Sequence, residues 1–194
     1  MFQGDDDFEA FRGLKMKRLL ASFFFCFLIF RFTVAEAEWL YNKQPVTNSP
    51  FAKTDGEFGA MLVFTDKPDQ LFEDWNKDTL EVHTDFVEKI QLNKTLLAAI
   101  IFSNCSADKK GKGNVTVDFT VLDPQGKVLT KKRGLEVWVN KTAPMYRDLE
   151  LSVDHIAITI KDGQQTGFYT VKALVHDKIA RKTLSLEHQF EVFE

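Results

Sequence analysis

Cysteine is almost absent from this 194-residue chain, which contains only Cys26 and Cys105. Cys26 falls in an N-terminal apolar segment that we expect to be removed, so Cys105 is the lone thiol of the remaining chain. A single cysteine excludes an internal disulfide, and the stability must then come from an ordinary hydrophobic core. No histidine is near Cys105 in the sequence. We therefore interpret it as an inert thiol at a strand end rather than as a catalytic nucleophile.

An excess of positive charge is also missing, since 25 Lys and Arg residues face 28 Asp and Glu residues and the net charge is −3. Phosphate binding needs a clear positive excess, so the balance argues against nucleic acid and against anionic membranes as partners. Two basic runs, Lys109–Lys112 and Lys131–Arg133, contain no interleaved aromatic residue. We interpret them as solvated loops, with an acidic partner or a surface glycan as the lesser alternative.

Long apolar runs are lacking as well, and the longest is the twelve-residue segment Leu19–Phe30, which Arg31 ends. As a helix it would reach about 18 Å, against a hydrocarbon core of about 30 Å. Lys17 and Arg18 precede it, and small residues at Ala35 and Ala37 follow it. This order is typical of a signal peptide, with cleavage after Ala37 or after Ala35. A cleaved signal is favoured over an uncleaved anchor, and it predicts a periplasmic or secreted protein with no membrane span after cleavage.

Four segments follow from this interpretation. Residues 1–15 carry negative charge where export signals carry positive charge. We therefore interpret them as a mis-assigned extension before a true start at Met16. The alternative is that they form a long, acidic n-region that export tolerates. Residues 16–37 are the signal peptide. Residues 38–57 lack periodicity and read as an extended lead-in from which Trp39, Leu40 and Phe51 dock on the domain. Residues 58–194 form one domain, which is long enough to bury a core.

Apolar residues alternate along most of this domain. Valines and Phe119 alternate over 115–121, isoleucines over 156–160, and two long alternating runs cover 169–175 and 184–192. Residues 95–103 are apolar at both parities, as in a central strand. One short helix is predicted after Asp66, which would cap it, with Pro68 in its first turn. The pattern predicts an all-β fold, an antiparallel immunoglobulin-like β-sandwich with one short helix, preceded by the signal helix.

Tyr169 lies two residues after Gly167, at the start of a predicted strand. Its side chain should point to the same face as the alternating apolar residues that follow, up to position 175. The arrangement is similar to the tyrosine corner of immunoglobulin-like domains, although their cysteine pair is missing. We expect the ring to be buried and the hydroxyl to bond to the preceding loop, 161–166.

The remaining candidates have plain structural interpretations. His176 and His188 flank the last hairpin, but a register that places Ala173 opposite His188 turns His176 to the other face, so we expect no shared metal and interpret His188 as a core histidine.

Trp138 alternates with its valine neighbours and should point away from their face, which makes it a candidate binding patch unless a loop covers it. Four Asn-x-Ser/Thr patterns begin at Asn93, Asn104, Asn114 and Asn140. They indicate a glycoprotein if the source is eukaryotic. If the source is bacterial, they reflect only the clustering of Asn, Ser and Thr at turns.

Seven short motifs are distributed between Phe58 and Phe193. They are Phe58-Gly-Ala60, Leu71-Phe-x-x-Trp75, Ile101-Phe-Ser-Asn-Cys105, Thr120-Val-Leu-Asp-Pro-Gln-Gly126, Glu136-Val-Trp138, Leu149-x-Leu-Ser-Val153 and Gly167-x-Tyr-x-Val-x-Ala173. As a set they resemble an uncharacterised family of exported proteobacterial β-rich proteins. The resemblance implies a periplasmic location and no known activity. It also implies a second cysteine shortly after Cys105, which residues 109–114 do not supply.

The sequence therefore predicts an exported, non-enzymatic binding or structural module of the bacterial periplasm or envelope. It predicts no catalytic, metal-binding or cofactor-binding residue, and its partner is an unknown protein or envelope component. Two alternatives remain: an enzyme whose site is assembled from loops, and a glycosylated eukaryotic secreted protein.

Overall fold

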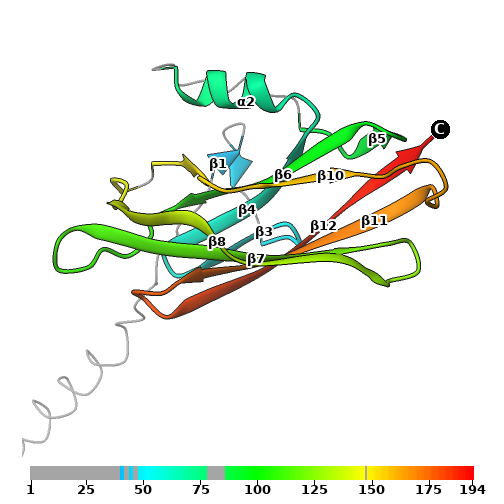
Figure 1. The fold of residues 1–194 in the computed structure, drawn as a ribbon. Coiled ribbons are helices and arrows are strands. Elements are labelled where there is room, and N and C mark those ends of the chain that lie inside the picture. The colour runs from blue at the N-terminus through cyan, green and yellow to red at the C-terminus, as the bar shows by residue number, and fades with distance from the viewer. Residues whose placement is uncertain (1–39, 42–43, 46–47, 78–85, 147) are drawn as a thin grey trace, which may run out of the picture. The chain divides into compact units, whose positions relative to one another are not determined.

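Alternating apolar residues build two five-stranded sheets, which Figure 1 shows as two layers. The computed structural model describes residues 40–41, 44–45, 48–77, 86–146 and 148–194. All of these belong to one unit, 36–194. The predicted extension, the signal helix and Trp39 lie outside the described residues. The all-β class with one short helix is confirmed for the part of the chain that is described.

The first sheet, called the β4 sheet here, has the strand order β10-β6-β4-β3, with β9 also paired to β6. All its pairs are antiparallel. Its strands are β3 (Ala52–Asp55), β4 (Phe58–Thr65), β6 (Thr95–Ser103), β9 (Glu150–Leu151) and β10 (Ile156–Thr159). A separate two-stranded ladder joins β1 (Leu40–Tyr41) and β2 (Gln44–Pro45). The end of the predicted lead-in 38–57 thus contributes β3 as an edge strand of this sheet.

The second sheet, called the β12 sheet here, has the order β5-β12-β11-β7-β8. Its strands are β5 (Lys89–Gln91), β7 (Lys112–Leu122), β8 (Val128–Thr142), β11 (Gly167–Asp177) and β12 (Lys182–Phe193). The short β5 runs parallel to β12, and the other pairs are antiparallel. This parallel pair is a departure from the purely antiparallel pattern that the sequence predicts.

The main core lies between the two sheets. Every residue of the predicted face at 115, 117, 119 and 121 of β7 is buried, and so is the face at 169, 171, 173 and 175 of β11. These side chains form one cluster with inward residues of β4 and β6, such as Phe64 and Ile100. The period-two pattern therefore identifies the buried face of each strand correctly.

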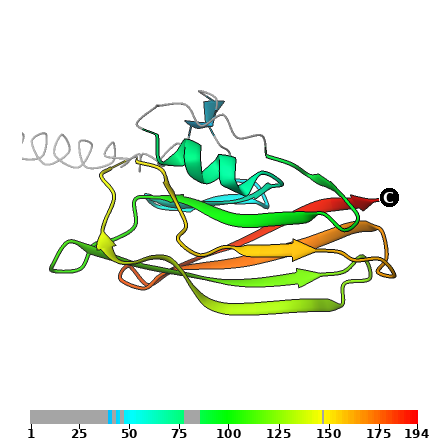
Figure 2. The ribbon, with the colours of Figure 1, turned by 45° about the horizontal axis from the view of Figure 1, so that its top comes forward.

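A second, smaller core covers the other face of the β4 sheet, where Figure 2 shows α2 (Pro68–Trp75) above the strands. Leu71 is fully buried against residues such as Val63 and Leu97, with Phe72 and Trp75 packed beside it. Strands β4 and β6 are consequently buried on both faces, as the apolar run at 95–103 predicts. The predicted cap is wrong, however: Lys67 occupies the N-cap position, with no side-chain capping bond, and Pro68 provides the first helical residue.

The last hairpin is paired two residues away from the predicted register. His188 lies opposite Val171, and Ala173 lies opposite Leu186. The physical reason is the tight turn after Asp177, whose carboxylate accepts hydrogen bonds from the backbone N–H groups of Ile179 and Ala180. That turn lets the strands pair out to Asp177 and Lys182. Since the shift is an even number of residues, His188 keeps its inward parity.

Candidate functional site

Two short segments, residues 50–51 and 87–88, run between the two sheets on the same side of the domain and are called the crossing segments here. In the first crossing segment, the carbonyl of Pro50 accepts from the N–H of Glu187 in β12, and that of Phe51 accepts from Leu62 in β4. In the second crossing segment, the N–H of Val87 donates to Phe64 in β4, and the carbonyl of Glu88 accepts from Glu191 in β12. Each segment thus joins both sheets through two successive residues.

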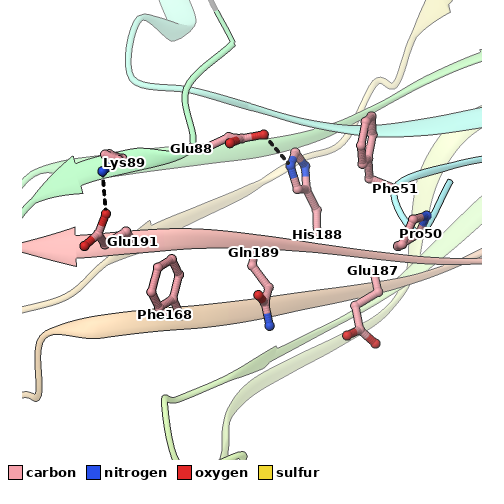
Figure 3. Close-up of a pocket in the computed structure, with 9 residues that line it drawn as sticks. All are labelled: Pro50, Phe51, Glu88, Lys89, Phe168, Glu187, His188, Gln189 and Glu191. Atoms are coloured by element: carbon pink, nitrogen blue, oxygen red, sulfur yellow. Dashed lines mark hydrogen bonds and ion pairs between the residues drawn. The ribbon is translucent and has the colours of Figure 1, made fainter.

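Between the crossing segments runs a groove, and His188 lies at its centre. A cavity of about 560 Å³ lies on the β12 side, lined by Pro50, Phe51, Glu88, Lys89, Phe168, Glu187, His188, Gln189 and Glu191 (Figure 3). A cavity of about 460 Å³ lies on the β4 side, lined by Phe51, Met61, Leu62, Val63, Phe86, Val87, Glu88 and His188. Because the two cavities share Phe51, Glu88 and His188, we treat them as one groove with two ends.

His188 is held rigidly at this centre. Its ring is stacked between those of Phe51 and Phe64, with centroids 4.7 and 4.5 Å away. Nδ1 lies 3.2 Å from the carbonyl oxygen of Leu62. A carbonyl can only accept, so this contact requires the proton on Nδ1. Nε2 then points toward the Glu88 carboxylate, 3.5 Å away.

The two ends of the groove differ in polarity. The β4 end is lined by aliphatic and aromatic side chains apart from the shared Glu88 and His188. The β12 end carries the carboxylates of Glu88, Glu187 and Glu191 and one ammonium group, that of Lys89. Lys89 pairs with Glu191 at 2.7 Å. Lys172, which does not line the groove, pairs with Glu187 at 3.2 Å.

Sequence reasoning finds only part of this groove. It predicts that Phe51 docks on the domain and that His188 points inward, and the structure confirms both. It places His188 beside Ala173, which is wrong because of the register. It gives no role to Glu88, because the hydrogen bond that holds this residue joins it to Glu191, about 100 positions away in the chain. The one available signal was a histidine in an otherwise apolar alternating set.

Trp138 does not point away from its valine neighbours as predicted. Val115 lies opposite Trp138 and Thr116 opposite Glu136, so Val137 is the extra residue of a β-bulge. Val137 is consequently buried, and Trp138 also packs against the main core, with its ring 5.6 Å from that of Phe102. The indole N–H donates to the carbonyl of Thr142 at 2.8 Å. This half-buried position does not favour a binding patch at Trp138.

Cys105 is buried at the end of β6, close to Gly113 and Trp138. Burial raises the pKa of its thiol to about 12, and the nearby Asp177 carboxylate contributes in the same direction. The thiol is therefore protonated at neutral pH and a poor nucleophile.

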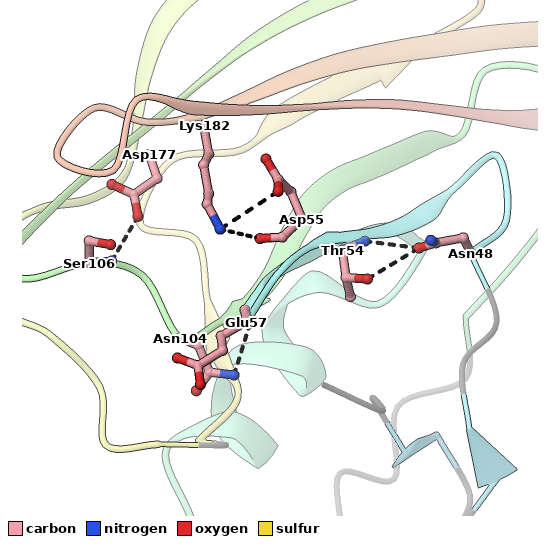
Figure 4. Close-up of polar contacts among 8 residues, drawn as sticks. All are labelled: Asn48, Thr54, Asp55, Glu57, Asn104, Ser106, Asp177 and Lys182. Carbon is pink, nitrogen blue, oxygen red and sulfur yellow. Dashed lines mark hydrogen bonds and ion pairs between the residues drawn. The ribbon is translucent and has the colours of Figure 1, made fainter. Parts of the chain in front are cut away.

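Asp177 is the fully buried carboxylate at this end of the domain. One of its oxygens accepts from the N–H of Ser106 at 2.7 Å (Figure 4), and the other accepts from Ile179 and Ala180. It therefore ties the loop after β6 to the β11–β12 turn. Because all three donors are backbone groups, we assign it a structural role.

Tyr169 is buried, and its hydroxyl donates to the carbonyl of Gln165, within the predicted loop. Burial raises the pKa of the phenol, and the Asp123 carboxylate raises it further. The hydroxyl is consequently protonated and able to donate.

We expect Tyr169→Phe to lower the free energy of unfolding by about 1 kcal/mol, the net value of one hydrogen bond, with the fold intact. Urea unfolding measures the loss, and circular dichroism checks the fold. A variant with wild-type stability would show that this hydrogen bond contributes nothing.

Three of the four asparagines and one of the two basic runs have local explanations. Asn93, Asn104 and Asn140 adopt positive φ angles of 66°, 53° and 59°, a conformation that asparagine tolerates better than most residues. The predicted loop at Lys131–Arg133 is instead an exposed part of the edge strand β8. Charges there discourage pairing with the edge of another sheet.

Metal-binding clusters and membrane-spanning helices are both absent from the described residues. These residues contain no group of three or more His, Cys, Asp or Glu side chains placed to hold a metal ion. None of the helices they form has the length and apolarity to cross a membrane.

Comparison with known proteins yields no family-model match and no match among curated proteins. Solved structures that this chain matches include a family 123 glycoside hydrolase from Clostridium perfringens, at 14% identity and a TM-score of 0.40, covering 71% of this chain and 27% of the hydrolase. This chain thus spans about a quarter of that protein. A CARDB domain from Pyrococcus furiosus, solved with two metal ions, is 14% identical with a TM-score of 0.35, covering 75% of this chain and 97% of that domain. A Niemann-Pick type C2 protein from the Japanese carpenter ant is 6% identical with a TM-score of 0.38, covering 75% of this chain and 96% of that one. At these scores, none of the three carries an argument about function.

Proposed function

We propose that this chain is an exported, non-enzymatic binding module of the bacterial periplasm or envelope, built on an immunoglobulin-like sandwich, and that its ligand occupies the groove between the two crossing segments. The observation that carries the proposal is the groove itself. It combines two adjoining cavities of about 560 and 460 Å³ with a few convergent polar groups. Ligand sites are commonly concave, largely apolar and supplied with a small number of placed polar side chains.

The rigidity of the groove supports the same function. The crossing segments are held by four backbone hydrogen bonds of 2.7–3.0 Å. His188 is held by two ring stacks and by the carbonyl of Leu62. A site that is already ordered costs less conformational entropy when a ligand binds, so more of the contact energy remains as affinity.

We expect the full chain, recovered from the envelope fraction where the proposal places it, to bind the neutral apolar dye N-phenylnaphthylamine with an increase in dye fluorescence. Val87→Trp should reduce this binding by about tenfold or more, because the indole would fill the apolar end of the groove. Val87 lines that end and is half-buried. Fluorescence titration measures both affinities.

Val128→Trp is the matched control, because it makes the same substitution at an exposed position of β8 outside the groove. Gln189→Trp at the exposed end of the groove is a second blocking variant that does not disturb the core. Circular dichroism checks that each variant keeps its sheets. Equal dye binding by the wild type and both blocking variants would contradict the proposal.

A further inference from the structure

The centre of the groove presents two hydrogen-bond acceptors to each other. The Nδ1 proton of His188 is used by the Leu62 carbonyl, so in the neutral ring Nε2 has a lone pair and no proton. The group that it faces at 3.5 Å is the carboxylate of Glu88, which is also an acceptor. The side chain of His188 is 14% exposed and that of Glu88 is 73% exposed, so the pair is reached from the groove mouth. A protonated imidazole pairs with Glu88 directly, whereas with the neutral ring a donor within hydrogen-bond distance of both atoms satisfies the two acceptors together.

The surrounding charges select a cationic donor. Among the described ion pairs, Lys89 neutralises Glu191 and Lys172 neutralises Glu187. No described lysine or arginine forms an ion pair with Glu88, whose carboxylate faces the imidazole. The β12 end of the groove therefore retains one negative charge beside His188. The aromatic faces of Phe51 and of Phe168, which is 60% exposed, line the same cavity and favour a cation further.

The other end of the groove accommodates an apolar body. Beyond Glu88 and His188, its lining consists of Phe51, Met61, Leu62, Val63, Phe86 and Val87. Removing apolar surface from water at such a lining is favourable in proportion to the area buried.

We infer that the groove binds a small amphipathic amine, with its ammonium group within hydrogen-bond distance of both Glu88 and Nε2 of His188 and its apolar chain toward Met61 and Val63. This inference rests on the proposed function and names the ligand class for the same site. A primary ammonium group offers three N–H donors, enough to serve both acceptors at once. Its charge compensates the carboxylate that no described lysine or arginine pairs with, and charge-assisted hydrogen bonds of this kind are the stronger ones.

Isothermal titration of the full chain with octylammonium, octanol and octanoate tests the inference, because these probes share a chain and differ in the head group. We expect octylammonium to bind about tenfold or more tightly than octanol, and octanoate to bind more weakly than either. Glu88→Gln should remove the preference for octylammonium while leaving the affinity for octanol unchanged. Nitrogen NMR of the His188 ring should show that the bound amine perturbs Nε2 more than Nδ1.

Glu57→Gln is the matched control, since it removes the same charge from an exposed position that lines neither cavity. It should keep the preference for octylammonium. Equal binding of the three probes by the wild type, or an unchanged preference in Glu88→Gln, would overturn the inference. If the neutral dye still binds in those cases, the proposed function stands and only the ligand class is wrong. If neither the dye nor any octyl probe binds, the proposed function fails as well.

Discussion

Replacing Asp177 with alanine is expected to lower the free energy of unfolding by about 3 kcal/mol or more. The carboxylate is fully buried and accepts from three backbone N–H groups, those of Ser106, Ile179 and Ala180. The three bonds are part-buried, so each donor that loses this acceptor costs about 1 kcal/mol or more, because water replaces the buried carboxylate only in part. Urea or thermal unfolding measures the loss.

Asp108→Ala provides the control for this prediction. The Asp108 carboxylate also accepts backbone hydrogen bonds, from Lys110 and Lys112 at 2.7 and 2.9 Å, but the residue is exposed. Water can satisfy those donors after the substitution, so we expect a loss of about 1 kcal/mol or less. If the two variants lose the same stability, burial is not what makes Asp177 important, and its structural assignment is wrong.

The strands and their buried faces could be predicted from the sequence because one physical constraint governs both. Side chains of a strand alternate between two faces, so a strand with one dry face must alternate in polarity. This is why the faces of β7 and β11 and the doubly buried strand β6 are all where the sequence predicts them. Each prediction used only residues that are neighbours in the chain.

The register and the groove could not be predicted, because they depend on contacts between distant residues or on a single backbone irregularity. The pairing of the last hairpin depends on the Asp177 turn, and the orientation of Trp138 depends on an extra residue in β8. The groove depends on hydrogen bonds that the N–H groups of Glu187 and Glu191 donate to the carbonyls of Pro50 and Glu88. Alternation carries no information about which distant carbonyl an edge N–H group will meet.

The second large effect is expected at Phe119, which is the largest side chain on the buried face of β7 and is only 1% exposed. It lies opposite Ala173 of β11, a small neighbour that cannot expand into the space that the ring would leave. We expect Phe119→Ala to lower the free energy of unfolding by about 3–5 kcal/mol, because the lost transfer energy and the remaining cavity add together. Chemical denaturation measures the loss.

Asp118→Ala tests whether the loss of stability expected for Phe119→Ala is specific to the buried face of β7 or would follow from any substitution in this strand. Asp118 is the adjacent residue on the opposite face, and its carboxylate accepts a solvent-exposed hydrogen bond from the N–H of Gly134. Removing one solvent-accessible acceptor should cost about 1 kcal/mol, several times less than removing the ring. The ratio of the two losses in the free energy of unfolding therefore measures how much more the buried face of β7 contributes to stability than its solvent-facing side. If Asp118→Ala were as destabilising as Phe119→Ala, the core between the two sheets would not be the main source of stability, and the domain would depend on the polar contacts of its β7–β8 edge instead.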